Sequence, residues 1–269
     1  HTCVYRIHDV PSEDKIHELR ENLTGFGYKL AKGQVLRPKL FNQILSKAKG
    51  TDSEETINQL VLRSQSQAEY SISNVGHFGL ALARYAHFTS PIRRYSDLLV
   101  HRALIAASNF DAGKKYSIAD QQLEDICKHI SQTERRAATA ERAANDRYLA
   151  SFMKDKVGQT FNATISGVKK FGVFVTIGQE NVDALLPTSK LPGDYYRYDE
   201  RRQTLAGRHN GLVLGLGQKI HVILKTADAI TGRLAVEYAE ESSSYRNMDH
   251  LIAPYKTRSK TSKNRRGKR

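Results

Sequence analysis

The sequence predicts an α+β protein with a mainly helical part over residues 1–155, a five-stranded β-barrel over residues 156–240 and a disordered basic tail over residues 241–269. Apolar residues recur at helical spacing in the first part and alternate as in strands in the second. The third part contains few apolar residues and therefore cannot form a buried core. A chain of 269 residues is long enough for two domains with separate cores.

Capping and periodicity predict the helices of the first part. We expect two short helices between residues 11 and 49, on either side of a loop around residues 31–38. A third helix begins at residues 51–55, where Thr and Ser caps are followed by acidic residues, and runs to about Gln67. A long helix is expected over residues 118–154, with one apolar stripe at intervals of three, four or seven. The stripe consists of Leu123, Ile126, Ile130, Ala137, Ala144, Tyr148 and Phe152.

The stretch over residues 87–102 predicts a phosphate-binding corner. Ser90 followed by Pro91 indicates a helix start, because Ser supplies a cap oxygen and Pro at the first helical position loses no hydrogen bond. Arg93 and Arg94 then fall in the first turn, where the helix dipole disfavours cations but free backbone N–H groups bind anions. A phosphate bound between the two guanidinium groups would explain why two cations lie at this end of the helix. The apolar face of this helix would be Ile92, Tyr95, Leu99 and Ala103.

Asp97 offers a second interpretation of the same stretch. It lies four residues after Arg93 and three after Arg94, so ordinary i,i+3 or i,i+4 ion pairing accounts for one of the two arginines. A solvated, ion-paired helix therefore stays open as an alternative to the phosphate site.

The alternation of apolar residues after Gly158 predicts the barrel. A glycine at position 172 indicates a kink at the start of the second strand. Five short strands with one long connection are typical of an OB fold, which binds single-stranded nucleic acid by stacking bases on exposed aromatic side chains. The strands are residues 161–168, 171–177, 182–186, 219–226 and 234–238.

The net charge of +14 and the pI near 9.7 favour a polyanionic partner, with nucleic acid ahead of an acidic membrane surface. No apolar run approaches the roughly 20 residues that span a bilayer. We therefore expect a cytoplasmic protein without a membrane partner. Two cysteines in unrelated contexts predict neither a disulfide nor a zinc site. His77, His87 and His101 lack metal-ligand spacing and are interpreted as packing or hydrogen-bonding residues.

The segment over residues 77–101 resembles the signature of the RNase II/RNase R family of exoribonucleases, and the resemblance continues upstream over residues 5–9 and 62–70. It implies a processive hydrolase that degrades single-stranded RNA from its 3′ end to nucleoside 5′-monophosphates with Mg²⁺. It also implies that Arg93 is catalytic and contacts the scissile phosphate. The neighbouring residues expected to bind RNA are Ser90, Arg94 and Tyr95.

The barrel resembles the S-one-type RNA-binding domain that follows the catalytic domain in RNase R-like enzymes. On this resemblance, Phe171 and Phe174 occupy the two aromatic RNA-binding positions, and Asp228 and Arg233 occupy two polar ones. Pro187 stands where such domains commonly have a histidine, which leaves that contact open. Because a kinked strand does not fix both rings outward, packing of one phenylalanine in the barrel core also stays open.

Glu141 lies on the apolar stripe of the long helix, where a carboxylate needs a partner. We expect it to face an RNA channel or to neutralise an arginine. A glutamate at the helix edge that reaches solvent is an equally open interpretation.

One feature of the family is missing from the sequence. The family holds Mg²⁺ with a closely spaced group of aspartates, whereas Asp9, Asp14, Asp52, Asp97 and Asp111 are scattered. We therefore expect no metal ligands in this chain, which would be a carboxy-terminal portion of a longer enzyme that binds RNA but does not cut it alone. The basic tail favours the RNase R subtype and a contact with the ribosome or structured RNA. We expect a monomer.

Two other function classes fit part of the sequence. A non-catalytic RNA-binding module associated with translation or the ribosome explains the charge and the strands, but it leaves the signature without a role. A DNA-binding protein with a basic helix in the major groove is the other alternative. Against it, Asp97 and an apolar face follow the two arginines.

Overall fold

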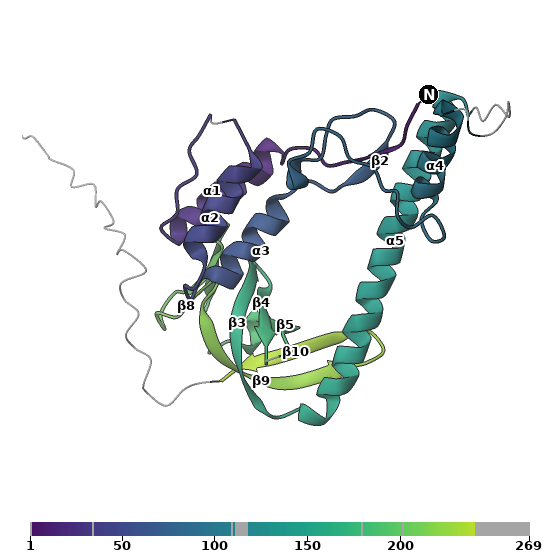
Figure 1. Ribbon diagram of the computed structural model, residues 1–269. Helices are drawn as coiled ribbons and strands as arrows, with labels where there is room; N and C mark the ends of the chain where they lie inside the picture. The colour runs from purple at the N-terminus through teal and green to yellow at the C-terminus, as the bar shows by residue number, and fades with distance from the viewer. Residues whose placement is uncertain are drawn as a thin grey trace, which may run out of the picture. The chain divides into compact units, whose positions relative to one another are not determined.

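The computed structural model describes residues 2–33, 35–108, 110, 118–178, 180–200 and 202–239 (Figure 1). In these residues, five α-helices precede a closed five-stranded barrel, which confirms the predicted α+β class and the order of its parts. Residues 1–239 form one compact unit, so the helical part and the barrel pack together. The tail predicted over residues 241–269 lies outside the described residues.

Three helices form the first core, in the places that the sequence predicts. They are α1 (Glu13–Gly25), α2 (Pro38–Ala48) and α3 (Glu54–Ser64). Pro38 opens α2, where its missing N–H costs no hydrogen bond, and acidic residues lie in the first turns of α1 and α3, where the helix dipole favours them. The buried side chains of this core are Ile16, Leu19, Leu23, Leu30, Phe41, Ile44, Ala48, Ile57 and Val61.

Two three-residue strands bring distant segments together. β1 (Tyr5–Ile7) pairs antiparallel with β2 (Glu69–Ser71), and a 3₁₀ turn, η1 (Phe78–Leu80), follows. Strands this short show no usable alternation, so the sequence does not predict them. Their core consists of Val4, Tyr70, Leu99, Leu123 and Cys127.

The helix of the signature begins later than the sequence predicts. α4 spans Tyr95–Ala107, with Arg94 at its N-cap, and the three preceding residues form a turn. The Ser90 carbonyl accepts the backbone N–H groups of Arg93 (3.2 Å) and Arg94 (3.0 Å), which closes this turn before the helix begins. The prediction of Ser90 as the cap and Pro91 as the first helical residue is therefore wrong.

The predicted apolar face of this helix is only partly right. Leu99 is buried and Ala103 is half-buried, whereas Ile92 is fully exposed and Tyr95 is 44% exposed. The later start of the helix explains the difference, because it places Ile92 in the turn rather than on the helix.

The long helix is confirmed within two residues at each end, as α5 (Asp120–Met153). Its predicted single stripe is wrong in the second half, where Tyr148 and Phe152 are 76% and 52% exposed. The helix packs in the first part near its start, while Ala150 and Met153 are buried in the barrel core. The two ends therefore bury different faces, and one stripe cannot describe both. A short 3₁₀ turn, η2 (Lys154–Lys156), leads into the barrel.

All five predicted barrel strands are present. They close in the order β10-β5-β4-β3-β9, with β9 paired back to β10 and a parallel pairing of β10 with β5. Their bounds are β3 (Thr160–Lys169), β4 (Gly172–Ile177), β5 (Val182–Pro187), β9 (Lys219–Asp228) and β10 (Arg233–Tyr238).

The long connection of the barrel has structure that the sequence does not predict. After a 3₁₀ turn, η3 (Thr188–Lys190), three short strands form a separate antiparallel sheet. Leu205 and Leu214 of this sheet are fully buried in the barrel core cluster. The strands are β6 (Tyr196–Asp199), β7 (Thr204–Gly207) and β8 (Val213–Gly215).

We predict that Gly172→Ala destabilises the barrel. A Cβ at this position would collide with the Leu186 carbonyl oxygen and lie 2.9 Å from Pro187 Cα on the adjacent strand. Because both obstacles are backbone atoms of a paired strand, the substitution should cost about 1–3 kcal/mol. Thermal unfolding followed by circular dichroism measures the effect. The control is Gly193→Ala, where a Cβ meets no atom within 4 Å, and equal midpoints for the two variants would contradict the prediction.

Candidate nucleic-acid interface

Asp97 holds the turn that carries the two arginines. Its side chain is fully buried, and Oδ1 accepts the Ser90 N–H (2.8 Å) and a guanidinium N–H of Arg94 (2.9 Å), while Oδ2 accepts the Ser96 hydroxyl (3.0 Å). Burial alone would raise the pKa of this carboxyl, but the hydrogen bonds from Arg94, Ser90 and Ser96 together hold the pKa below its usual value. A charged carboxylate therefore ties Ser90 to the first turn of α4.

The two arginines have different surroundings. The Arg94 guanidinium is paired with Asp97, and its Nε is buried without a hydrogen-bond partner in the described part of the chain. Arg93 is exposed, and its side chain makes no hydrogen bond or ion pair with any described residue. One arginine is thus ion-paired, as the alternative interpretation expects, and the other is available to an external anion.

Exposed aromatic side chains lie close to Arg93 in the sequence. Tyr95 and Phe88 are 44% and 45% exposed. The Phe88 ring lies 4.2 Å from the ring of His101, whose Nε2 is 2.7 Å from the Phe88 carbonyl oxygen. Proteins bind single-stranded nucleic acid with exposed rings that stack on bases and cations that contact phosphates, and this short segment contains both.

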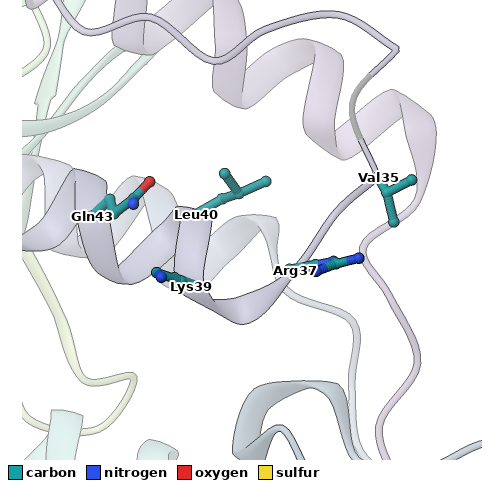
Figure 2. Close-up of a pocket in the computed structure, with 5 residues that line it drawn as sticks. All are labelled: Val35, Arg37, Lys39, Leu40 and Gln43. Atoms are coloured by element: carbon teal, nitrogen blue, oxygen red, sulfur yellow. The ribbon is translucent and has the colours of Figure 1, made fainter.

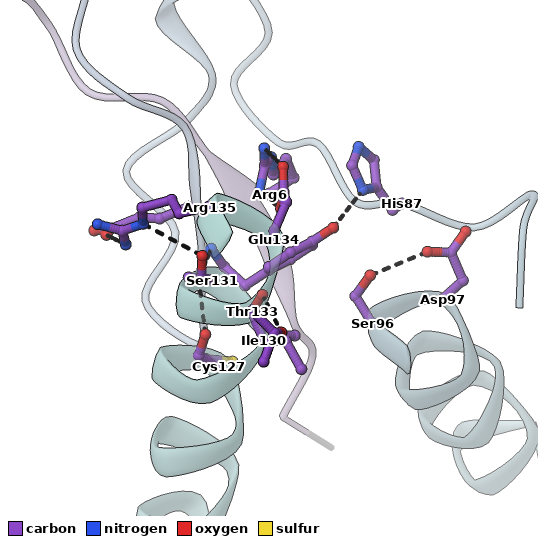
Figure 3. A network of polar contacts seen from close by, with 12 residues as sticks. Arg6, His87, Ser96, Asp97, Cys127, Ile130, Ser131, Thr133, Glu134 and Arg135 are labelled. Carbon is purple, nitrogen blue, oxygen red and sulfur yellow. Dashed lines mark hydrogen bonds and ion pairs between the residues drawn. The ribbon is translucent and has the colours of Figure 1, made fainter. Parts of the chain in front are cut away.

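A polar network joins the signature to β1, β2 and α5 (Figure 3). Arg6 makes two hydrogen bonds with Glu134 (2.7 and 2.6 Å), and its guanidinium lies 4.7 Å from the centre of the Tyr70 ring. The Tyr70 N–H donates to Ser131 Oγ (3.0 Å), and the Tyr70 hydroxyl is hydrogen-bonded to His87 Nδ1 (2.9 Å). Tyr70 therefore connects four segments that are far apart in the sequence.

The three histidines singled out in the sequence make hydrogen bonds, as predicted. His77 accepts a backbone N–H of η1, His87 bonds to Tyr70, and His101 bonds to a backbone carbonyl. Burial, reinforced by the positive charges of two nearby arginines, lowers the pKa of His87. The His87 imidazole is therefore neutral at pH 7.

Two phenylalanines form an aromatic surface on the barrel. Phe171 and Phe174 are 56% and 38% exposed, and their rings stand edge to face with centroids 6.0 Å apart. We call this pair the stacking surface. The alternative in which one of the rings packs in the barrel core is wrong, because that core is filled by aliphatic neighbours such as Val173 and Val175.

The two polar positions on the barrel differ in role. The Asp228 carboxylate accepts hydrogen bonds from the N–H groups of Ile230 (2.9 Å) and Thr231 (3.3 Å) and from the Thr231 hydroxyl (2.6 Å), which lower its pKa. It thus closes the β9–β10 turn. Arg233 is exposed and lies opposite Asp228 in the hairpin register, where it adds a positive charge to the surface.

Glu141 lies in the exposed middle of α5. Residues 134–148 are all exposed, including Ala137 and Ala144 of the predicted stripe. The Glu141 side chain makes no hydrogen bond or ion pair with a described residue, so it does not neutralise an arginine within the described chain.

A basic hollow lies beside α2 and the loop before it, and the sequence reasoning missed it. One part has a volume of about 360 Å³. It is lined by Val35, Arg37, Lys39, Leu40 and Gln43, which Figure 2 draws as sticks. An adjoining part of about 520 Å³ adds three further cations, Arg20, Lys29 and Lys47. The usable signal was the run between Gly25 and Gly50, which contains six Lys or Arg and no Asp or Glu.

Comparison with known proteins accounts for both parts of the chain. Residues 1–109 match the RNB domain, and residues 154–238 match the S1 RNA binding domain. Ribonuclease R of Aquifex aeolicus is 39% identical to the chain over 239 residues, and ribonuclease R of Escherichia coli is 38% identical over 228 residues. Both parts of the chain are thus similar to ribonucleases R, as the resemblance to the RNase II/RNase R family implies.

The similarity covers most of this chain but a smaller part of its relatives. The two alignments cover 89% and 82% of the chain, but 34% and 28% of the A. aeolicus and E. coli proteins. This RNase R-like chain therefore spans about a third of the length of the relatives that it matches.

Solved structures of similar proteins share the fold. The apo form of Mycoplasma genitalium RNase R matches with a TM-score of 0.80 at 28% identity, covering 88% of this chain and 38% of that one. The same protein in complex with ribose methylated single-stranded RNA matches with a TM-score of 0.82, at the same identity and coverage. Yeast Ssd1, described as a pseudonuclease, matches with a TM-score of 0.61 at 23% identity over 76% of this chain and 26% of its own, which shows the fold alone.

Among the described residues of the RNase R-like chain, no group of three or more His, Cys, Asp or Glu side chains is placed to hold a metal ion. No helix in the described part of the chain is both long and apolar enough to cross a membrane.

We predict that the RNase R-like chain loses stability on acidification partly through His87. Because folding lowers the pKa of His87 below the usual value near 6.5, protonation favours the unfolded chain. Its stabilising contribution is complete above about pH 6.5 and is lost as the pH falls through the folded-state pKa. The unfolding midpoint, measured from pH 8 to 5, should fall less steeply in His87→Gln than in the unmodified chain. Identical pH dependence in the two proteins would contradict this prediction.

Proposed function

We propose that this chain supplies RNA binding and the phosphate-contacting arginine to an exoribonuclease that hydrolyses single-stranded RNA in the 3′-to-5′ direction to nucleoside 5′-monophosphates. The observation that carries the proposal is the contrast between the two signature arginines. Asp97 engages Arg94, whereas Arg93 is exposed and unpaired among the described residues. A guanidinium in that state is suited to bidentate contact with a phosphate.

Each remaining residue of the proposed interface has a distinct task. The rings of Phe171 and Phe174 stack on bases, and Arg233 lies near the backbone phosphates that follow. Tyr95 offers a third exposed ring beside Arg93. Ser90 and Arg94 act indirectly in this scheme, because the Ser90 backbone N–H and the Arg94 guanidinium hold the turn through Asp97.

The metal requirement belongs to the proposal for the whole protein. Phosphodiester hydrolysis needs an activated water and neutralisation of charge on phosphoryl oxygens, which Mg²⁺ supplies when carboxylates hold it. The described residues contain no group of three or more potential metal ligands that could do so. We propose that this chain alone binds RNA without hydrolysing it. A cytoplasmic location, a monomeric state, and contact of the tail with the ribosome or structured RNA remain predictions.

The experiment that tests the function compares this chain with the complete protein. In buffer containing Mg²⁺, the complete protein should shorten a 3′-overhanging or single-stranded oligoribonucleotide and release nucleoside 5′-monophosphates, and EDTA should stop the reaction. The chain alone should bind the same RNA and leave it intact. Hydrolysis by the chain alone would overturn the division of roles.

A non-catalytic RNA-binding module is the second candidate function. The observation in its favour is the lack of a metal-binding group among the described residues. If the complete protein also binds RNA without degrading it in Mg²⁺, this candidate replaces the exoribonuclease. Competition with DNA of the same sequence separates both candidates from a DNA-binding protein.

We predict that replacing Arg93 affects RNA binding, whereas replacing Arg94 affects the stability of the fold. Arg93→Ala should weaken binding of a single-stranded oligoribonucleotide, reduce the slope of log affinity against log salt by about 0.7, and leave the unfolding midpoint unchanged. Arg94→Ala should instead lower the stability by about 1.5–3 kcal/mol, because buried Asp97 loses its charged partner. Titrations by fluorescence anisotropy and thermal melts measure both properties. A melt shift for Arg93→Ala equal to that of Arg94→Ala would refute the assignment.

We also predict that Phe171→Ala and Phe174→Ala each weaken RNA binding, by about 1–3 kcal/mol for every base that loses its stacking partner. The salt dependence should stay unchanged, because no charge is removed. Phe152→Ala is a matched control, since Phe152 is 52% exposed but lies on α5 outside the stacking surface. An equal loss of affinity in the control would show that stacking at this surface is not responsible.

A further inference from the structure

Strand β3 has a bulge at Ser166. On one side Ile165 pairs with Val175, and on the other Gly167 pairs with Phe174, with a shift of register between them. Ser166 is therefore the extra residue of the bulge and has no partner on β4. A bulge frees the backbone groups of its extra residue for a different partner.

The partner of this bulge comes from the helical part of the chain. Arg63, in the last turn of α3, donates a hydrogen bond from Nη1 to the Ser166 carbonyl oxygen at 2.9 Å. The two residues are 103 positions apart in the sequence. A helix thus holds the barrel backbone at a point where the β3–β4 ladder is interrupted.

The bulge lies directly beneath part of the stacking surface. A Cβ at Gly167 would lie 3.5 Å from the Phe174 ring, so the ring rests on the glycine backbone. Phe174 in turn stands edge to face with Phe171. The direction of both rings therefore depends on the backbone next to Ser166.

α3 contacts the same segment a second time. The Gly217 N–H donates to the Ile165 carbonyl oxygen (2.8 Å), and a Cβ at Gly217 would lie 2.9 Å from Thr56 Oγ1 and 3.2 Å from Phe26 Cε1. Because Thr56 and Arg63 both belong to α3, one helix holds the bulge directly and through the neighbouring loop.

We propose that Arg63 is a positioning residue for the stacking surface: through the Ser166 carbonyl it fixes the backbone on which Phe174 rests, and so sets the affinity for single-stranded RNA without touching the RNA. The proposal depends on the proposed function only in taking single-stranded RNA as the ligand of the stacking surface. The positioning itself is a property of the free protein. Loss of one hydrogen bond from a charged donor should weaken RNA binding about three- to tenfold.

A double-mutant cycle on the full chain tests the proposal. Affinities for a fluorescein-labelled twelve-nucleotide single-stranded RNA are measured for the unmodified chain, Arg63→Ala, Phe174→Ala and the double variant. If Arg63 acts through the ring, its effect should disappear in the Phe174→Ala background. Equal effects of Arg63→Ala in both backgrounds would overturn the proposal.

The salt dependence distinguishes positioning from a direct phosphate contact. Arg63→Ala should leave the slope of log affinity against log salt unchanged, whereas removal of a phosphate contact reduces it by about 0.7. Arg136→Ala is the control for loss of one positive charge, because Arg136 is exposed on α5 and its side chain makes no hydrogen bond or ion pair with a described residue. A reduced slope for Arg63→Ala beyond that of the control would indicate direct contact and overturn the proposal.

A spectroscopic measurement tests positioning without RNA. The chain contains no tryptophan, so Phe174→Trp introduces a single reporter at the stacking surface. Adding Arg63→Ala should shift the emission maximum and broaden the lifetime distribution at temperatures where melts show the chain folded. Unchanged emission would overturn the proposal. If instead the emission responds but neither Phe174→Ala nor the unmodified chain shows specific RNA binding, the proposed function fails and the positioning role stands.

Discussion

The buried charge of Asp97 is the constraint on which the candidate site depends. A carboxylate removed from water must be satisfied by donors in the chain, and Asp97 obtains them from the Ser90 backbone, the Ser96 hydroxyl and the Arg94 guanidinium. These bonds hold residues 90–97 in one conformation. The same bonds engage one arginine and leave its neighbour exposed. A structural interaction therefore determines which arginine is available to bind a phosphate.

The turn that carries Arg93 and the stacking surface belong to one continuous set of contacts. α5 is held close to its middle by Glu134, which pairs with Arg6, and at its end by Met153, which is buried in the barrel core. α3 provides the second connection, through Arg63 and the bulge of β3. RNA bound at both places would thus meet two surfaces held by the same helices, rather than two independently moving modules.

The sequence predicts most of the fold because its long elements carry repeated signals. The ends of α5 and all five barrel strands follow from periodicity over many residues. The start of α4 does not, because Ser-Pro is an ordinary helix start and the competing bonds of Asp97 depend on tertiary burial. The three-residue strand β8 is too short to show a period.

Within the site, motif and composition predicted which residue types gather, but not how they pair. The sequence leaves open which of the two arginines pairs with Asp97, and the folded structure shows that it is Arg94. The contact of Arg63 with Ser166 joins residues 103 positions apart through a backbone carbonyl, which no side-chain pattern reveals. The most direct test of the central claim is a structure of this chain bound to a short single-stranded RNA. It should show the Arg93 guanidinium against a phosphate while Arg94 remains on Asp97, and an Arg93 that points into solvent with RNA bound elsewhere would contradict the account.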